Sequence, residues 1–351
     1  MLKRKTIYFV SRLLAIVYLT LTFISCSDEN PVISPDNYGF DSARFNWTED
    51  TIGNQSMYNY AFWVPDTSNI FLIDAYSNTL LKLDNRNKTF YTFSNNILIS
   101  VLLGPDLNNG YMFGTDVTEG NTKFLVWKYI GNSFVMIQEI PIPFSTRLWQ
   151  GYYVSQSEMW FIGRDDGFIA KYDGSSITQY RLPDTLLYMD IFADKQNKIK
   201  ITALGEEIRN PYPLLINYIF EYDDINNNWN VVFREYYDFS LVVLDRQIFG
   251  VKKRAIYSFN GQTFQKILDF SNYLITTGDM EGLSISNFMI TCCIPIGNPS
   301  SGLAHWNGSK LSNENIRFCT TGARVKMFND RLCVLVRAAN GTTYINIGKK
   351  K

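Results

Sequence analysis

The residue types that most often carry catalysis are scarce and scattered in this sequence. Among 351 residues there is one histidine, His305, which excludes a metal site built from several imidazoles. His305 lies just before Trp306 on a predicted strand, a position typical of a polar strand residue. Adjacent acids occur at Asp165-Asp166 and Glu206-Glu207, in predicted loops. Paired carboxylates can perform glycoside hydrolysis, but two neighbouring acids in a loop are also typical of a solvated turn.

The cysteines suggest structural roles rather than chemistry. Apart from Cys26, the chain has Cys292, Cys293, Cys319 and Cys333, and four thiols allow three complete pairings. Cys292 and Cys293 are adjacent on a predicted strand and point to opposite faces, whereas Cys319 and Cys333 flank a hairpin-like stretch and can approach each other. Buried unpaired thiols are the alternative. We find no zinc spacing and no phosphate-binding glycine loop, and the oxygen-rich run at residues 223–228 lacks the EF-hand pattern. No cofactor is therefore expected.

Aromatic side chains are the more promising binding groups. The chain has 25 Phe, 22 Tyr and 7 Trp, or 15% aromatic residues, most of which must fill a core. A few fall in or beside predicted connecting loops, where exposed rings next to polar groups suit stacking on sugars or contact with a protein. We expect the candidate binding face to contain Trp149, Tyr152, Asp165, Asp166, Tyr212 and Tyr236.

A repeated hairpin positions these residues. β-rich runs that end in an aromatic residue are followed by a polar turn and a second β run, and Asp-Gly or Asn-Gly in such turns predicts a hairpin in which both turn residues have positive φ. Seven copies can be aligned, with equivalent positions separated by 37 to 50 residues and a mean of about 44. The equivalent residues are Asp84, Ile130, Asp173, Asp223, Asn260, Asn307 and Ile347.

This period matches the four-stranded blade of a β-propeller. In the third repeat the four strands are expected at residues 148–154, 158–163, 167–172 and 177–182. The last repeat ends with a strand at residues 341–348 that lacks a partner, and the orphan run at residues 43–47 can supply the missing outer strand. The sequence thus predicts an all-β propeller over residues 42–349, with about seven blades. Six or eight blades, a β-sandwich pair and a β-helix are the alternatives.

Two segments resemble known propeller repeats. Residues 159–163 and 167–174 resemble the propeller repeats in sensor regions of bacterial two-component regulators, in which a Trp-containing strand precedes a Gly-initiated strand ending in Tyr-Asp-Gly. Tyr222 and Trp229 bracket six turn residues, as in the hairpin of kelch repeats, although the kelch Gly-Gly pair is absent. These resemblances imply the fold and transfer no signalling role.

The N-terminus has the pattern of an export signal. A basic region with Lys3, Arg4, Lys5 and Arg12 precedes twelve apolar residues, 13–24, which is shorter than the roughly 20 residues that span a bilayer. The segment ends in Phe23-Ile24-Ser25-Cys26, which resembles the lipobox of bacterial lipoproteins, with Phe23 where Leu is usual. The resemblance implies a signal peptide at residues 1–25 and lipid attachment at Cys26. An uncleaved signal anchor is the alternative.

The residues after Cys26 indicate where the chain resides. Ser27 stands where Asp would be the usual inner-membrane retention signal, so we expect the outer membrane, with the domain either periplasmic or surface-exposed. The acids Asp28 and Glu29 resemble a surface-export tag, or form a solvated tether. Residues 26–41 contain Pro31, Pro35 and Gly39 without an apolar period and predict an extended lipidated tether.

Charge and composition narrow the function. With 33 basic and 33 acidic residues the formal net charge is zero, so the sequence has no electrostatic footprint for nucleic acid. We therefore expect a membrane-anchored binding or scaffold module for a glycan or a protein partner. The alternative is a propeller-type polysaccharide hydrolase or lyase that uses loop carboxylates.

Overall fold

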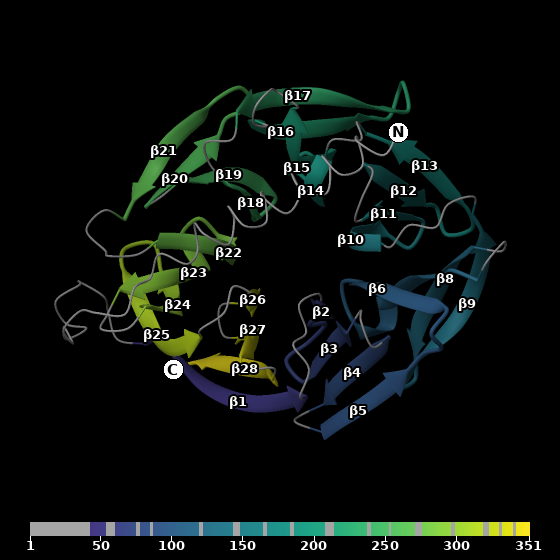
Figure 1. Cartoon of the computed structure of the whole chain (residues 1–351), viewed down its shortest axis with the longest axis horizontal. Helices are drawn as coiled ribbons and strands as arrows, with labels where there is room; N and C mark the ends of the chain where they lie inside the picture. Colours follow the sequence, from purple (N-terminus) through teal and green to yellow (C-terminus); the bar gives the residue numbers. More distant parts are fainter. Residues whose placement is uncertain are drawn as a thin grey trace, which may run out of the picture.

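The structure is a ring of seven four-stranded antiparallel sheets, seen along its axis in Figure 1. The computed structural model describes residues 43–53, 60–74, 78–84, 87–118, 122–142, 148–163, 167–182, 186–207, 214–236, 240–252, 254–270, 276–295, 299–318, 323–329, 332–339 and 342–351. The seven sheets confirm the predicted all-β propeller and set the number of blades at seven. Among the described residues no helix is long and apolar enough to cross a membrane.

Each blade is a meander whose first strand lies nearest the axis and whose last strand lies at the rim (Figure 1). Blades 1 to 3 comprise β2 (Tyr60–Trp63), β3 (Asn69–Asp74), β4 (Thr79–Asp84), β5 (Asn87–Thr92); β6 (Ile97–Leu103), β7 (Tyr111–Asp116), β8 (Lys123–Ile130), β9 (Ser133–Pro141); and β10 (Leu148–Ser155), β11 (Glu158–Gly163), β12 (Phe168–Tyr172), β13 (Ile177–Arg181). A short 3₁₀ turn, Leu107–Asn109, lies between β6 and β7.

Blades 4 to 7 follow the same order. They comprise β14 (Leu186–Ala193), β15 (Ile199–Glu207), β16 (Leu214–Asp223), β17 (Asn228–Tyr236); β18 (Ser240–Leu244), β19 (Gln247–Lys252), β20 (Ala255–Phe259), β21 (Phe264–Asp269); β22 (Thr276–Ser284), β23 (Asn287–Pro295), β24 (Pro299–Trp306), β25 (Leu311–Phe318); and β26 (Ala323–Asn329), β27 (Leu332–Ala339), β28 (Thr342–Lys350), β1 (Phe45–Gly53). The strands of blade 3 agree with their predicted ranges to within one residue at each end.

The ring is closed by a strand from the opposite end of the chain, as the sequence predicts. β1 pairs antiparallel with β28, from Phe45 opposite Lys350 to Thr51 opposite Tyr344. β1 is thus the outer strand of blade 7, where the other blades use their own fourth strand. This arrangement gives the third strand of blade 7 a hydrogen-bonded partner instead of an open edge.

The buried glutamate Glu314 fastens this closing strand to the neighbouring blade. Glu314 lies on β25 of blade 6 and is 1% exposed. Its carboxylate accepts hydrogen bonds from the backbone N–H groups of Arg44 (3.2 Å) and Phe45 (3.0 Å) and from the indole N–H of Trp47 (3.2 Å). The Ser312 hydroxyl donates a fourth bond at 2.7 Å. A buried carboxylate with this donor set ties the start of β1 to blade 6.

The hairpins between the third and fourth strands of blades 1 to 6 are confirmed, whereas Ile347 lies within β28 and marks no turn, because the fourth strand of blade 7 is β1. The turn geometry differs from the prediction. Gly174 (94°), Gly261 (99°) and Gly308 (90°) have positive φ and the Asp or Asn before each does not, while Gly131 (66°) follows Ile130 and the β16–β17 turn uses Asn227 (52°). Asp173 shows the reason, because its side chain accepts the N–H groups of Ser175 (2.8 Å) and Ser176 (2.7 Å). In these glycine-containing turns the acid or amide therefore caps the turn from its first position, and the glycine that follows takes the positive φ.

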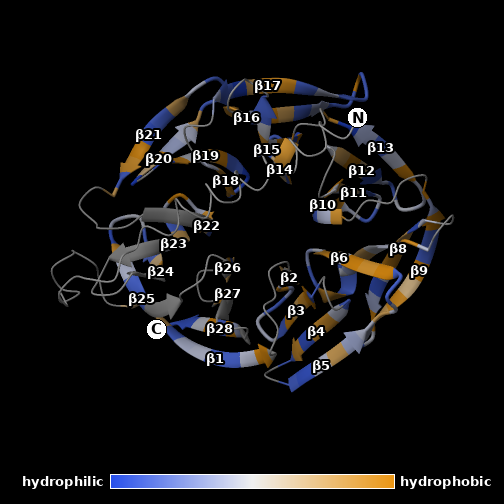
Figure 2. Cartoon of the chain, viewed as in Figure 1, coloured by the Kyte–Doolittle hydropathy of each residue, from blue (hydrophilic) through white to orange (hydrophobic). Residues whose placement is uncertain are grey.

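The hydrophobic core is divided into seven clusters, one at each seam between neighbouring blades. They are built from apolar residues of the inner and middle strands; the inner strand β6, for example, is apolar along nearly its whole length (Figure 2). Trp160, Phe161 and Phe113 are fully buried in such seams. This accounts for the high aromatic content, because large flat side chains fill the wedge between twisted sheets.

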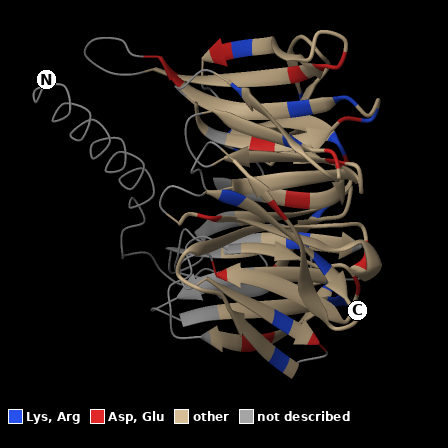
Figure 3. Ribbon diagram, turned by 90° about the vertical axis from the view of Figure 1, so that its right-hand side faces the viewer, with Lys and Arg blue, Asp and Glu red and all other residues tan. Residues whose placement is uncertain are grey.

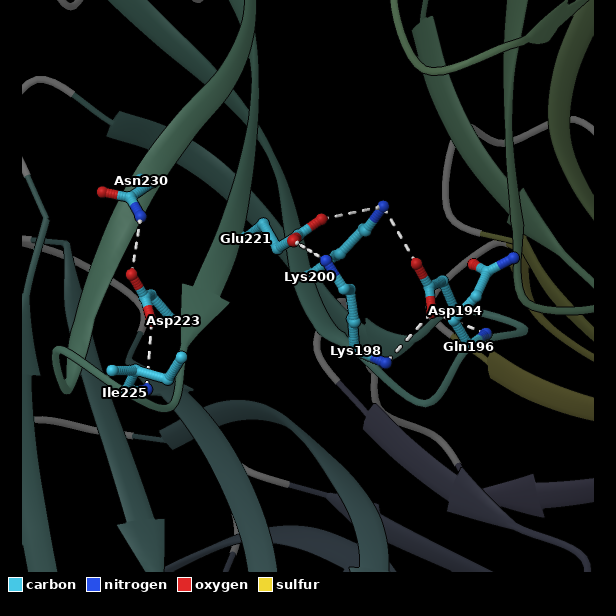
Figure 4. Close-up of polar contacts among 8 residues, drawn as sticks. All are labelled: Asp194, Gln196, Lys198, Lys200, Glu221, Asp223, Ile225 and Asn230. Carbon is cyan, nitrogen blue, oxygen red and sulfur yellow. Dashed lines mark hydrogen bonds and ion pairs between the residues drawn. The ribbon is translucent and has the colours of Figure 1, made fainter.

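The seam between blades 4 and 5 has the smallest described apolar cluster and a large polar network. Its buried apolar residues are Phe192, Ile219 and Ile248. Beside them, Lys200 bridges Asp194 (2.9 Å) and Glu221 (3.2 Å), as Figure 4 shows. These ion pairs lie within blade 4.

Arg246 connects the two blades across this seam. It lies at the β18–β19 turn, and its guanidinium donates to the Ala193 carbonyl (3.1 Å), the Asp194 carbonyl and the Asn197 side chain (2.6 Å) of blade 4. Every acceptor is already placed by its own turn, so the contact is preorganised. The polar network therefore supports a seam in which few apolar side chains are buried.

Replacing Arg246 tests this role. We expect Arg246→Ala to lower the free energy of unfolding by about 2 kcal/mol, because three acceptors lose a charged donor. For a domain of this size that corresponds to a fall in Tm of about 3 °C. Arg234→Ala is the matched control, since Arg234 makes a surface pair with Glu207 (2.9 Å) and should change stability by less than about 1 kcal/mol. Equal effects of the two variants in thermal unfolding would contradict a special role for Arg246.

Candidate functional site

The strands nearest the axis carry few charges, and these charges gather in three blades. The seven inner strands β2, β6, β10, β14, β18, β22 and β26 contain five charged residues: Asp190, Asp279, Glu281, Arg324 and Lys326. Three are acidic and two are basic. In strands otherwise made of apolar and neutral residues, charges at the axis need a reason beyond packing.

Four of the inner-strand side chains form what we call the axial cluster: Gln150, Asp190, Glu281 and Lys326. Gln150 on β10 donates through Nε2 to Asp190 Oδ1 on β14 at 2.6 Å. Lys326 on β26 lies with its Nζ 3.4 Å from Glu281 Oε1 on β22. These contacts join blade 3 to blade 4 and blade 6 to blade 7, and the charges of Glu281 and Lys326 act on Asp190.

Solvent reaches the axial cluster although its strands are the innermost ones. The Lys326 side chain is 50% exposed and that of Glu281 is 32% exposed. The strands that carry these side chains are the ones nearest the axis of the ring (Figure 1). The axial cluster is thus accessible to solvent on the innermost strands, as a ligand site must be.

The surroundings shift the protonation of this cluster. Loss of hydration, together with the negative charge of Glu281, raises the pKa of Asp190 to about 6, although the Gln150 hydrogen bond and Lys326 act in the opposite direction. The negative charge of Glu281 raises the pKa of Lys326 above its ordinary value. Asp190 consequently exchanges its proton near neutral pH, which is characteristic of functional carboxyl groups.

The axial cluster offers hydrogen-bond donors, acceptors and a titrating acid, but no described metal site. Carboxylates, an amide and an ammonium can bind hydroxyl, amine or amide groups of a ligand. No group of three His, Cys, Asp or Glu side chains among the described residues is arranged to hold a metal ion. Two carboxyl groups are present, which is also the minimum for acid–base chemistry on a sugar bond.

The residues predicted for the binding face are not all placed by the structure. Trp149 and Tyr152 lie on the inner strand β10, not in a loop, and pack partly buried against the cluster between blades 3 and 4. Tyr236 is the last residue of β17 and is 48% exposed. Asp165, Asp166 and Tyr212 lie outside the described residues. Contact of these six residues with a ligand stays a prediction.

Of these residues, Tyr152 shares a strand face with a member of the axial cluster. It stands two positions after Gln150 on β10, and side chains two apart on a strand share a face. The other paired acids, Glu206 and Glu207, end β15, where Glu207 pairs with Arg234. Nothing in the described contacts joins them to the axial cluster.

The axial residues Asp190, Glu281 and Lys326 are not identified by the sequence reasoning. A local signal did exist for Asp190, which is a lone acid within the apolar run LLYMDIFA. A charge in the middle of an inner strand cannot be satisfied by the strand itself and must face either a partner or solvent. Reading each blade's first strand for such charges would have found the site.

His305 and Cys333 have structural positions. His305 is 3% exposed on β24, its Nε2 contacts Asn287 Oδ1 at 2.8 Å, and its ring meets Phe45 edge-on at 5.3 Å. Cys333 on β27 is a buried free thiol, so it does not pair with Cys319. Cys292 and Cys293 lie on β23 as expected, but their side chains are outside the description, as is Cys319.

Burial of His305 predicts a pH dependence of stability. Loss of hydration, with the charges of Arg44 and Lys350, lowers its pKa to about 4 from an ordinary 6.5. Above pH 6.5 the His305 imidazole is neutral in both the folded and the unfolded state. Between pH 6.5 and 4 it gains a proton only in the unfolded chain. The free energy of unfolding should therefore fall by about 3 kcal/mol as pH drops through this window.

The measurement is the difference in unfolding free energy between wild type and His305→Gln at pH 8 and pH 4.5. Asp190 is present in both proteins, so taking the difference removes its contribution. That contribution has the opposite sign, because the raised pKa of Asp190 stabilises the folded state as pH falls from 6 to 4. We expect the wild type to lose stability relative to the variant on acidification. A difference that does not change with pH would show that His305 is not held neutral.

Charges elsewhere are interspersed in sign. Seen from the side, Lys and Arg alternate with Asp and Glu over the strands that face the viewer (Figure 3). Surface pairs such as Lys88–Asp50 (2.7 Å) and Lys123–Glu139 (2.6 Å) account for several of them. These charges on the outer strands are therefore paired at the solvent-exposed surface.

The comparisons with known proteins concern the fold. No family model matches this chain, and no curated protein matches it in sequence. A solved streptogramin B lyase has a TM-score of 0.60 at 13% identity, covering 86% of this chain and 97% of that chain. Virginiamycin B lyase from Staphylococcus aureus has a TM-score of 0.59 at 14% identity and covers 88% of this chain and 100% of that chain.

A catalytically inactive form of that lyase, solved with quinupristin, is similar to the same degree (TM-score 0.58, 13% identity, 88% and 100% coverage). YCF48 from Cyanidioschyzon merolae has a TM-score of 0.55 at 10% identity, covering 85% of this chain and 98% of that chain. At identities of 14% or less these likenesses carry no function. They agree with the strand topology in one conclusion, which is that the chain folds as a β-propeller.

Proposed function

We propose that this protein is a lipid-anchored propeller of the outer membrane that binds a glycan at the axial cluster. The observation that carries the binding role is the accessible group Gln150, Asp190, Glu281 and Lys326, which four blades supply at the centre of the ring. Hydroxyl-rich ligands are recognised by this kind of planar polar side chain, with an aromatic ring beside it. Tyr152 supplies such a ring on the strand of Gln150.

The raised pKa of Asp190 supports a role in binding, because an ionised Asp190 destabilises the fold instead of holding it together. A carboxyl group whose pKa is raised lowers the stability of the folded protein when it is ionised. We expect Asp190→Asn to raise the free energy of unfolding at pH 7.5. The gain should vanish below pH 4, where the Asp190 carboxyl is protonated and as uncharged as the asparagine that replaces it. Thermal unfolding at the two pH values checks this, and a loss of stability at pH 7.5 would contradict it.

The binding experiment uses the full chain, purified in detergent, and a panel of neutral, acidic and amino oligosaccharides of defined length. We expect retention of at least one member by the wild type and loss of about tenfold or more in affinity in Asp190→Asn and Glu281→Gln. Glu139→Gln is the matched control, since Glu139 lies on the rim strand β9 in a surface pair with Lys123. Failure to retain any oligosaccharide would overturn the glycan role and favour a protein partner.

Anchoring rests on the sequence alone, because residues 1–42 lie outside the described residues. Its basis is the basic region, the short apolar stretch and the cysteine at position 26. One acyl chain gives marginal membrane binding, whereas several chains hold a protein firmly. Radioactive fatty acid should label the wild type and leave Cys26→Ser unlabelled; label that persists in the variant would exclude Cys26 as the attachment site.

A polysaccharide hydrolase or lyase is the second candidate. Asp190 and Glu281 favour it, because they are two carboxyl groups close enough for the charge of Glu281 to raise the pKa of Asp190. The fold neighbours include lyases, but a shared fold transfers no chemistry. New reducing ends or unsaturated products from the retained oligosaccharide, absent with Asp190→Asn, would establish turnover; retention without product would establish a binding module.

A further inference from the structure

The formal charges of the inner strands do not balance. Among the charged inner-strand side chains that the structure describes, Asp190 and Glu281 oppose Lys326, which leaves one negative charge when all three are ionised. Asp279 and Arg324 also lie on these strands, but their side chains are outside the described part of the chain. A site with excess negative charge favours a cationic ligand.

Among the described contacts, the negative charge that lacks a cationic partner is the one on Asp190. Lys326 lies 3.4 Å from Glu281, so that pair is compensated. The described contact of the Asp190 side chain is with the neutral amide of Gln150 at 2.6 Å. Asp190 is the inner-strand acid whose charge is paired with a dipole instead of a cation, which is consistent with its reluctance to ionise.

From this imbalance we infer that the glycan of the axial cluster is an amino sugar whose free ammonium group binds beside Asp190. This inference rests on the proposed binding of a glycan. The ammonium would donate to the carboxylates of Asp190 and Glu281, because each carboxylate offers about four acceptor positions and the described contacts occupy only part of them. The sugar ring would lie toward Tyr152, which shares a strand with Gln150.

An ammonium group and its acetylated counterpart differ in charge while the sugar rings stay alike. The ammonium would supply a cation beside Asp190, whose described side-chain contact is with the neutral amide of Gln150. An acetamido group brings no charge and leaves Asp190 uncompensated. The structure therefore predicts a preference for the free amine over the acetylated sugar.

The test compares a glucosamine tetramer with an N-acetylglucosamine tetramer, using the full chain in detergent at pH 7.0 and isothermal titration calorimetry. We expect the free amine to bind about tenfold tighter or more, and this preference to fall to about twofold or less in Asp190→Asn. Lys326→Met should act in the opposite direction and strengthen binding of the free amine, because it removes the competing cation. Lys123→Met on the rim is the matched control for loss of a lysine.

The outcomes separate this inference from the proposed function. Equal affinity for the two tetramers, or weaker binding of the free amine by Lys326→Met, would overturn the amino-sugar inference while binding of a glycan stands. Binding of neither tetramer would also overturn it, and the wider oligosaccharide panel would then decide the proposed function. A preference that disappears in Asp190→Asn and grows in Lys326→Met would establish it.

Discussion

Glu314→Ala is expected to lower the free energy of unfolding by about 3 to 5 kcal/mol, the largest effect we anticipate from one polar substitution. The reason is that three N–H donors at the start of the closing strand, on Arg44, Phe45 and Trp47, lose their acceptor in a buried position. A fall in Tm of about 5 to 8 °C should accompany this loss.

The location of the loss is as informative as its size. Amide hydrogen exchange in the Glu314→Ala variant should accelerate first in β1 and β28, because the ring opens at the strand pair that Glu314 fastens. Glu139→Ala, which breaks only the surface pair with Lys123, is the control and should change Tm little. Exchange that accelerates evenly in all blades, or a Tm within about 2 °C of the wild type, would show that the carboxylate does not hold the closure.

Trp160→Ala is the second substitution with a large expected effect, at about 3 to 5 kcal/mol. Trp160 is fully buried between blades 3 and 4, with ring centroids 4.6 Å from Tyr222, 5.7 Å from Tyr180 and 5.6 Å from Trp229. Its indole N–H donates to Glu158 at 2.9 Å. Truncation leaves a large cavity and removes several aromatic contacts at once.

Chemical denaturation measures this effect, and two further variants interpret it. Trp160→Phe keeps part of the ring contact and should lose clearly less than the alanine variant. Phe90→Ala removes an aromatic side chain that is 53% exposed on the rim strand β5 and should cost less than about 1 kcal/mol. If Trp160→Ala were no worse than Phe90→Ala, the seam would not depend on its aromatic packing.

The architecture follows from local signals that recur along the chain. Each hairpin has an Asp, an Asn or a glycine turn at the same place in its repeat, so the period, the strands of blade 3 and the seven-blade count could be read without any long-range information. The closing strand could be inferred as well, because the last repeat offers one strand too few. The detailed turn geometry was wrong, since the Asp or Asn caps the turn with its side chain instead of entering the left-handed region.

The axial cluster could not be read in the same way. Asp190, Glu281 and Lys326 are far apart in sequence and meet because their strands become the innermost ones of different blades. No local period encodes contacts across the axis. The same holds for Glu314, whose partners on β1 lie about 270 residues away. Trp149 and Tyr152 lie on β10, within the strand expected at residues 148–154, so assigning them to a connecting loop was wrong although the strand itself was predicted.

The pairing of β1 with β28 has a consequence for how the chain matures. These two strands are separated by nearly the whole propeller in sequence. The hydroxyl of Thr48 donates to the carbonyl of Ile347, which lies 299 positions further along the chain. A nascent chain can assemble blades 1 to 6 in order from local contacts, but β1 must wait unpaired until blade 7 has been synthesised. During that interval its exposed edge is free to join another molecule, so nascent chains that stall before β28 should be the ones that aggregate or recruit chaperones.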